Sequence, residues 1–235
     1  MIENLPLHIS LVFILTVVAT LLLFFVTLKN STSEKLKSKS TQIMIGLIVW
    51  IILQSVIALK GFYLNTHSLP PKFIFAIAPP ILLIGILFAT RLGRKFIDSL
   101  PLENITYTNV VRVPVELVLY ALFFCNTIPQ LMTFEGRNFD ILAGITAPFI
   151  AYFSFSKNRI GRKWILIWNF ISLGLLLNIV INAILSAPFP FQQFAFEQPN
   201  IAVFYFPFSL LPAFIVPVIL FGHLVSIRQL INFKK

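Results

Sequence analysis

Long apolar stretches, separated by short segments that carry nearly all the charge, constrain this chain more than any other feature. A bilayer hydrocarbon core about 30 Å thick needs about 20 apolar residues of helix to cross it. Stretches of about that length recur along the chain, so the pattern predicts seven membrane-spanning helices. The expected spans are residues 7–28, 42–60, 73–90, 114–132, 141–156, 164–185 and 201–227.

The composition agrees with this prediction. Of the 235 residues, 58% are hydrophobic and 11% are charged, whereas soluble domains carry about 25% charged residues. Once the spans are assigned, too little chain is left for a separate soluble domain. We therefore predict an all-α polytopic membrane protein, in which residues 1–235 form a single transmembrane domain built as a seven-transmembrane-helix bundle.

The distribution of Lys and Arg predicts the orientation of this bundle. One side of the predicted membrane takes fifteen of the 18 basic residues, and the other takes three, which are Lys60, Lys72 and Arg137. Basic residues concentrate on cytoplasmic loops, so we expect an outside N-terminus and a cytoplasmic C-terminus. This bias also explains the net charge of +10, and no basic-aromatic pattern indicates a nucleic-acid partner.

Two further features of the chain are simple to interpret. Cys125 is the one cysteine in the sequence, so neither an intramolecular disulfide nor a cysteine metal site can form. The residues before the first apolar run include Glu3 but no Lys or Arg. A secretory signal needs a basic n-region, so we expect this run to be kept as a helix.

The charged segment 91–113 allows two interpretations. Apolar residues Leu92, Phe96 and Ile97 alternate with basic Arg91 and Arg94, a pattern typical of a helix that lies in the membrane interface. The alternative is a cytoplasmic extension of the third span.

Polar residues inside the predicted spans are the candidates for function, because an ionisable group in a membrane is costly to bury. A first set lies toward the cytoplasmic side. Arg112 and Glu116 are four residues apart and share one helix face, while Asn169 and His223 lie at a similar depth on the sixth and seventh spans. We expect these four to form an inner polar cluster. It would bind an anion, a proton or a headgroup, or else be an interfacial salt bridge with snorkelling side chains.

A second set of amides lies toward the outside. It comprises Gln54 on the second span, Asn126 on the fourth, and Asn178 and Asn182 on the sixth. Such amides usually bond neighbouring helices, and the alternative is an uncharged binding cavity. We expect Asn178 to line a cavity that it shares with Gln54 or Asn126, and Glu116 to pair with Arg112 or His223.

Three segments carry a resemblance to a known group of proteins. They are Arg112-Val-Pro-Val-Glu116, the outer loop 133–140, and the sequence from Phe191-Gln-Gln-Phe194 to Pro199. These segments resemble those of small, uncharacterised, multi-pass membrane proteins of bacteria. The resemblance implies the bacterial inner membrane and the same seven-helix plan, and it carries no known activity.

Three functions fit these observations. The first is a bundle that binds or transports a small uncharged or amphipathic molecule, because polar residues and prolines interrupt the helices where a cavity could form. The second is a non-catalytic sensor or accessory subunit, with a membrane protein or a second copy as its partner. The third is an enzyme that acts on a lipid or isoprenoid, with Glu116 or His223 as acid or base. No motif indicates a cofactor or a metal. Under all three functions, we expect the protein to contact membrane lipid.

Overall fold

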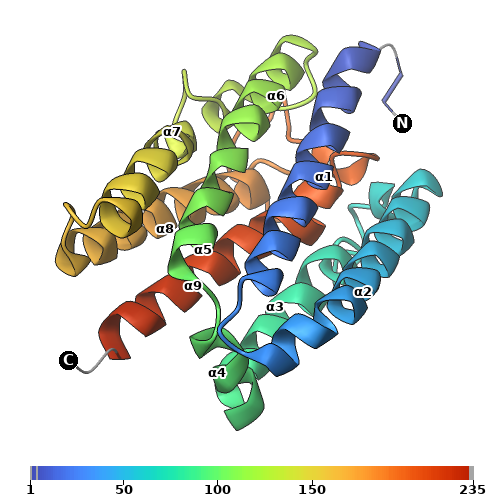
Figure 1. The fold of residues 1–235 in the computed structure, drawn as a ribbon. Helices are drawn as coiled ribbons and strands as arrows, with labels where there is room; N and C mark the ends of the chain where they lie inside the picture. The colour runs from blue at the N-terminus through green and yellow to red at the C-terminus, as the bar shows by residue number, and fades with distance from the viewer. Residues whose placement is uncertain (1, 4, 233–235) are drawn as a thin grey trace.

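The computed structural model describes residues 2–3 and 5–232, and all regular structure within them is helical. The elements form one elongated bundle in which α1 begins at one end and α9 finishes at the opposite end (Figure 1). The α-helices are α1 (Leu7–Lys29), α2 (Glu34–Leu59), α3 (Ile74–Ala89), α4 (Arg91–Asp98), α5 (Leu102–Thr108), α6 (Arg112–Phe124), α7 (Asp140–Ala151), α8 (Arg162–Leu185) and α9 (Val216–Asn232). Short 3₁₀ turns are η1 (Phe62–Leu64), η2 (Asn109–Val111), η3 (Gln130–Met132) and η5 (Ala202–Phe204), and π-helical turns are η4 (Tyr152–Ser156) and η6 (Leu211–Ile215).

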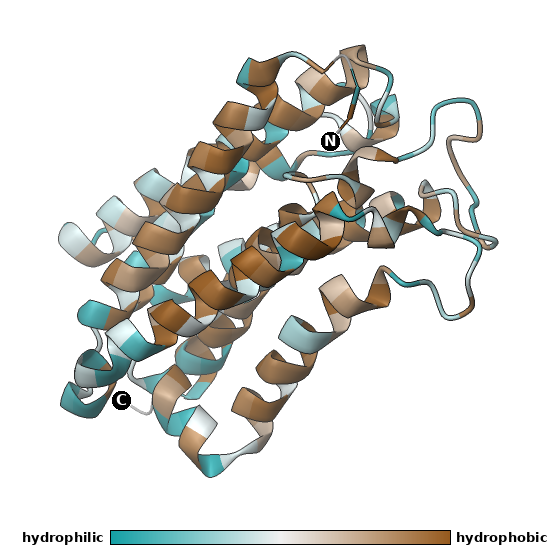
Figure 2. Cartoon of the chain, turned by 90° about the vertical axis from the view of Figure 1, so that its right-hand side faces the viewer, coloured by the Kyte–Doolittle hydropathy of each residue, from teal (hydrophilic) through white to brown (hydrophobic). Residues whose placement is uncertain are grey.

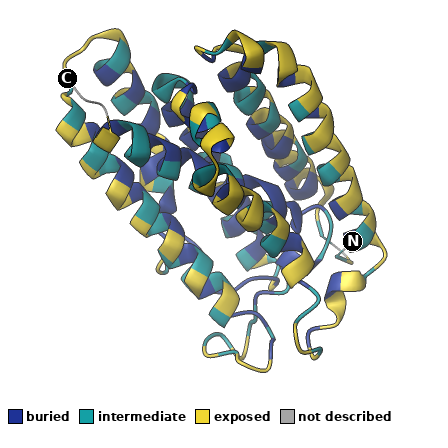
Figure 3. Cartoon of the chain, turned by 90° about the horizontal axis from the view of Figure 1, so that it is seen from below, coloured by how far each residue is buried: buried dark blue, intermediate teal, exposed yellow. Residues whose placement is uncertain are grey.

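The centre of the bundle is formed by α1, α5, α6 and α9. Helix α1 packs against α2, α5 and α6, while α9 packs against α5 and α8. Phe13 of α1, Leu122 of α6 and Phe214 of η6 are almost fully buried in the largest apolar cluster. Buried residues line the inner faces of the helices, whereas exposed residues follow their outer faces (Figure 3).

The outer faces of the helices are apolar. Leu15 and Leu22 of α1 and Val49 and Ile52 of α2 are each more than half exposed, and apolar residues cover the lengths of the helices (Figure 2). Soluble monomers rarely expose apolar surface on this scale. Among the described residues, five helices are long and apolar enough to cross a membrane: residues 7–29, 34–59, 102–124, 162–185 and 211–232.

The fourth of the expected spans lies earlier in the sequence than predicted. Helices α5 and α6 join through η2 into one continuous helix, Leu102–Phe124, so the expected bounds 114–132 are wrong. The predicted span begins two residues after Arg112, but the side chain of Arg112 is buried inside the bundle. The helix ends at Phe124, because Asn126 takes a left-handed conformation with φ 55°.

Helix α4 is not an extension of α3, since the two axes meet at 93°. The side chain of Thr90 caps α4 by accepting a hydrogen bond from the Gly93 backbone at 3.1 Å. A Cβ on Gly93 would lie 2.2 Å from the Leu87 carbonyl oxygen, so only glycine allows this close turn. The extension proposed for segment 91–113 is therefore wrong. The other interpretation, a helix that lies in the membrane interface, stays a prediction for α4 alone, because residues 102–113 belong to the next helix.

Two other expected spans are less regular than predicted. Helix α7 and η4 together cover only Asp140–Ser156, about 25 Å at ~1.5 Å per residue. The preceding segment 125–139 enters the protein interior, where Ile128, Thr133 and Asn138 are fully buried. The last long helix begins at residue 211 instead of 201, because residues 201–210 form η5 and buried turns.

Candidate functional site

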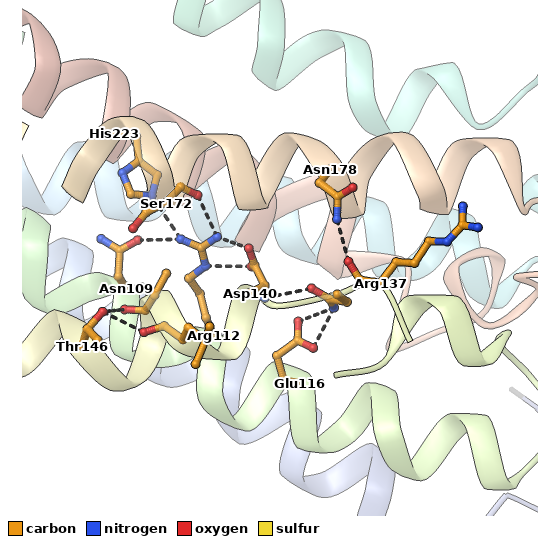
Figure 4. Close-up of polar contacts among 12 residues, drawn as sticks. Asn109, Arg112, Glu116, Arg137, Asp140, Thr146, Ser172, Asn178 and His223 are labelled. Atoms are coloured by element: carbon orange, nitrogen blue, oxygen red, sulfur yellow. Dashed lines mark hydrogen bonds and ion pairs between the residues drawn. The ribbon is translucent and has the colours of Figure 1, made fainter. Parts of the chain in front are cut away.

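A chain of buried polar side chains runs through the centre of the bundle, and Arg112 is its hub (Figure 4). The side chain of Arg112 is 3% exposed and forms a bidentate ion pair with Asp140, the first residue of α7. In this pair Nε donates to Asp140 Oδ2 at 2.7 Å and Nη2 donates to Oδ1. Such fork geometry is the strongest form of an arginine–carboxylate contact.

The remaining donors of Arg112 are also used. Nη1 donates to Asn109 Oδ1 at 3.4 Å and to His223 Nε2 at 3.1 Å, and Nη2 donates to the Ser172 carbonyl oxygen at 3.1 Å. An arginine side chain has five N–H donors, and these contacts together with the ion pair occupy all of them. Arg112 therefore has no free donor with which to bind an anion.

His223 on α9 continues the chain in one direction. Because arginine can only donate, Nε2 of His223 accepts, and the ring proton sits on Nδ1, which donates to Asn169 Oδ1 at 3.0 Å. Asn169 in turn donates to the Ile165 carbonyl oxygen within α8. Both ring nitrogens of His223 are thus occupied, and the imidazole is held between α6 and α8.

Glu116 ends the chain in the other direction. Asn138, in the buried segment before α7, donates from Nδ2 to both carboxylate oxygens of Glu116, at 2.7 and 2.6 Å. The Oδ1 of Asn138 accepts a hydrogen bond from the Asp140 backbone N–H at 3.1 Å, which links Asn138 to the Arg112–Asp140 ion pair. A carboxylate can accept about four hydrogen bonds, so Glu116 retains free acceptor capacity.

The structure thus brings together the residues of the expected inner cluster, with one difference. Arg112, His223 and Asn169 are linked directly, as the sequence suggested. Glu116 is 1% exposed and faces the interior, but its partner is Asn138, so the expected pairing with Arg112 or His223 is wrong. That these residues bind a ligand stays a prediction.

An apolar cavity of about 440 Å³ reaches this polar chain from the side of α3. Ile77 and Ile81 of α3, Leu176 and Val180 of α8, and Ile219 of α9 form part of its wall. Its few polar contributors are Arg112, Glu116 and Asp140 at one region and Asn200 at another. Asn200 is 1% exposed, and its Oδ1 accepts no hydrogen bond from any residue within the described ranges.

The outer amides do not form the expected shared cavity. Gln54 accepts a hydrogen bond from the Tyr63 hydroxyl and donates to the Phe75 carbonyl oxygen at 3.4 Å. That carbonyl is free because Pro79, four residues later, has no N–H to offer. Gln54 therefore joins α2 to α3, as amides commonly do between membrane helices. Burial also raises the pKa of the Tyr63 hydroxyl to about 12.

The other three amides lie elsewhere. Asn178 donates to the Arg137 carbonyl oxygen at 2.7 Å, and Asn182 donates to the Asn178 backbone and side chain. Asn126 is exposed at the end of α6. The prediction that Asn178 shares a cavity with Gln54 or Asn126 is therefore wrong, because their hydrogen bonds go to separate partners.

Asp140, Asn138, Asn109 and Asn200 are the residues that sequence reasoning missed. All four lie at or beyond the edges of the predicted spans, where Asn and Asp are ordinarily turn or cap residues. Asn138 does carry a local signal, because an Asn two residues before Asp140 matches a turn that leads into a helix. The described residues contain no group of three or more His, Cys, Asp or Glu that could hold a metal ion.

These features define a class: an all-α protein with several helices long and apolar enough to cross a membrane, and a buried polar chain beside an apolar cavity. Residues 71–231 match the model of a family described as a domain of unknown function, DUF8737. The chain therefore belongs to this uncharacterised family. The matched residues contain the whole cavity wall and the polar chain. Comparison with curated proteins and with solved structures finds no match.

Proposed function

We propose that this chain is an integral protein of the bacterial inner membrane that binds a small uncharged or amphipathic molecule in the cavity beside α3. Transport of that molecule is the wider role that this proposal allows. The observation that carries it is an apolar cavity that ends on a buried, ionisable Glu116. Its volume of about 440 Å³ lies within the range of about 300–1,000 Å³ typical of small-molecule sites.

The buried polar chain supports a ligand-binding role for the cavity next to it. Ionisable residues within membrane helices are rare and usually mark a ligand or ion pathway. Arg112 and Asp140 neutralise each other, whereas the direct partner of Glu116 within the described part of the chain is the neutral amide of Asn138. A carboxylate at the end of an apolar cavity supplies the polar contact that fixes the orientation of an amphipathic molecule.

A pair of substitutions tests binding in this cavity. Ala183 lines the cavity, whereas Ala89 is exposed at the end of α3 and is not part of the wall. We expect Ala183→Trp to abolish retention of amphiphiles that co-purify with the protein, measured by mass spectrometry of mildly solubilised protein, and Ala89→Trp to leave it unchanged. Equal retention in both variants would contradict binding in this cavity.

The topology is part of the proposal. We propose seven crossings, with α7 and η4 as the fifth and with α3 as the third, an outside N-terminus and a cytoplasmic C-terminus. The basic residues support this orientation. The start of α1 and the end of α9 lie at opposite ends of the bundle, which supports termini on opposite sides of the membrane. A C-terminal fusion should be active with a cytoplasmic reporter and silent with a periplasmic one. The reverse result would refute the orientation.

A second candidate, an accessory subunit of a membrane complex, is favoured by one observation. A groove of about 650 Å³ lies between α2 and α3 and is lined mainly by apolar residues such as Leu47, Leu83 and Phe96. A helix of another membrane protein, or a second copy, would fill it. Cross-linking from a cysteine placed at Leu83 in native membranes would detect such a partner. An acid–base role for His223 has less support, because both of its ring nitrogens are already bonded.

A further inference from the structure

The hydrogen-bonding groups along the cavity wall define which kind of molecule it can hold. Among the described residues of the wall, Arg112 is the one cation, and Asp140, Asn109, His223 and the Ser172 carbonyl occupy all its donors. What the wall still offers is acceptor capacity. We infer that the cavity selects a single-chain amphiphile whose head donates hydrogen bonds, as a hydroxyl or an ammonium does, and that it rejects anionic heads. This inference rests on the proposed function.

Glu116 is the first acceptor. Both of its oxygens are bonded to the same amide nitrogen, Nδ2 of Asn138, which leaves further lone pairs on each oxygen. The charges of the Arg112–Asp140 pair cancel, so the Glu116 carboxyl group, when ionised, is the local charge without a counter-ion. An anionic head would meet this carboxylate without a free donor to compensate, whereas a donating head would be attracted to it.

Asn200 is the second acceptor. Its Nδ2 donates one hydrogen bond to the Ala183 carbonyl oxygen at 3.1 Å, which fixes the orientation of the side chain. Its Oδ1 is buried in the cavity wall and accepts no bond from the described part of the chain. A buried acceptor without a partner is costly, and a donor on a bound molecule would satisfy it.

The rest of the cavity wall is mainly apolar. It includes Leu176, Ile179 and Val180 of α8 and Ile77 and Ile81 of α3. An alkyl or isoprenoid chain fits this lining, because moving apolar surface out of water requires no hydrogen bonds in return. The expected ligand is therefore a long apolar chain with a hydroxyl or amine at its end, held head-first at Glu116 or at Asn200.

Four probes with the same twelve-carbon chain test this selection on the unmodified protein. The probes are dodecanol, dodecylammonium, dodecyl methyl ether and laurate, each added to protein in discs of zwitterionic lipid at pH 8.5. Binding is measured by native mass spectrometry and by the shift in unfolding temperature. We expect dodecanol and dodecylammonium to bind at least about tenfold more tightly than the ether and laurate, the ratio that 1.4 kcal/mol represents.

The outcomes separate the two proposals. If the ether or laurate binds as tightly as dodecanol, the selection for donors is wrong, although a binding cavity remains. If none of the four binds, or if Ala183→Trp leaves their binding unchanged, the proposed function itself fails.

Two substitutions locate the head of the bound molecule. Glu116→Gln keeps the size of the side chain and removes its charge, so it should weaken the binding of dodecylammonium about tenfold more than that of dodecanol if the head lies at Glu116. Asn200→Leu removes Oδ1, so it should weaken the binding of both dodecylammonium and dodecanol if the head lies at Asn200. If neither variant changes the binding of either probe, the inference is wrong.

Discussion

Removing the charge of Asp140 should destabilise the protein far more than removing that of Asp98, although both pair with an arginine through two hydrogen bonds. Asp140 holds Arg112 inside the bundle, where the side chain of Asp140 is 7% exposed and that of Arg112 is 3% exposed. Asp98 holds Arg228 at the surface through contacts of 2.9 and 3.1 Å, with side chains that are 47% and 24% exposed. The two pairs therefore differ mainly in burial.

The magnitudes follow from that difference. Breaking a buried ion pair by removing one partner costs about 3–5 kcal/mol, and an unpaired arginine at the centre of a membrane helix costs about 2.5–3.5 kcal/mol on insertion scales. Asp140→Asn keeps one acceptor, so we expect a loss of about 3 kcal/mol in the free energy of unfolding, near the lower end of the buried-pair range. Asp98→Asn should cost under about 1 kcal/mol, as for exposed pairs.

Arg112→Met should be the most damaging of the three substitutions. It leaves the Asp140 carboxylate unpaired in the interior, and it also removes the donors that serve Asn109, His223 and the Ser172 carbonyl. Each buried acceptor left without a partner costs about 1–3 kcal/mol. The expected order of destabilisation is therefore Arg112→Met, then Asp140→Asn, then Asp98→Asn.

Thermal unfolding of the purified variants in one detergent provides the assay. For a chain of this size, about 1 kcal/mol lowers the unfolding temperature by about 2–4 °C. We expect a decrease of about 6–12 °C for Asp140→Asn and of less than about 4 °C for Asp98→Asn by the same scale. Equal decreases for the two variants would refute the argument from burial, and so would an Arg112→Met variant as stable as the parent protein.

Three further predictions address other parts of the molecule. Gly93→Ala should destabilise the turn between α3 and α4, because its Cβ would collide with backbone, whereas Gly85→Ala, with nothing within 4 Å, should be neutral or stabilising by up to about 1 kcal/mol in chemical unfolding. Asn138→Ala should cost about 1–3 kcal/mol, because Glu116 loses its partner, and the added Glu116→Leu should recover part of that loss. Burial raises the pKa of Tyr63 to about 12, so the folded state holds this proton while an unfolded tyrosine releases it near pH 10. Stability should then fall as pH rises from 10 to 12, and Tyr63→Phe should remove that part of the fall.

Much of the helical framework could be predicted from the sequence. The bounds of the first, third and sixth spans differ from α1, α3 and α8 by no more than two residues at either end. These stretches combine a long apolar run with a polar or proline-containing flank, and both signals are local. The polar residues of the inner cluster were also identifiable, because a charged or amide side chain within an apolar run needs a partner wherever the chain folds.

The partners, the depth of the cluster and the cavity were decided only by the tertiary structure. Arg112 pairs with a residue 28 positions away and contacts another 111 positions away, and a local pattern contains no information on such distances. The span predicted from the sequence begins at residue 114, just after Arg112, and a lone arginine is costly in lipid. Its pairing with Asp140 removes that cost and lets the helix continue on both sides of it. The cavity exists because α3 stands apart from α8, and the distance between two helices depends on how all the side chains of the bundle pack.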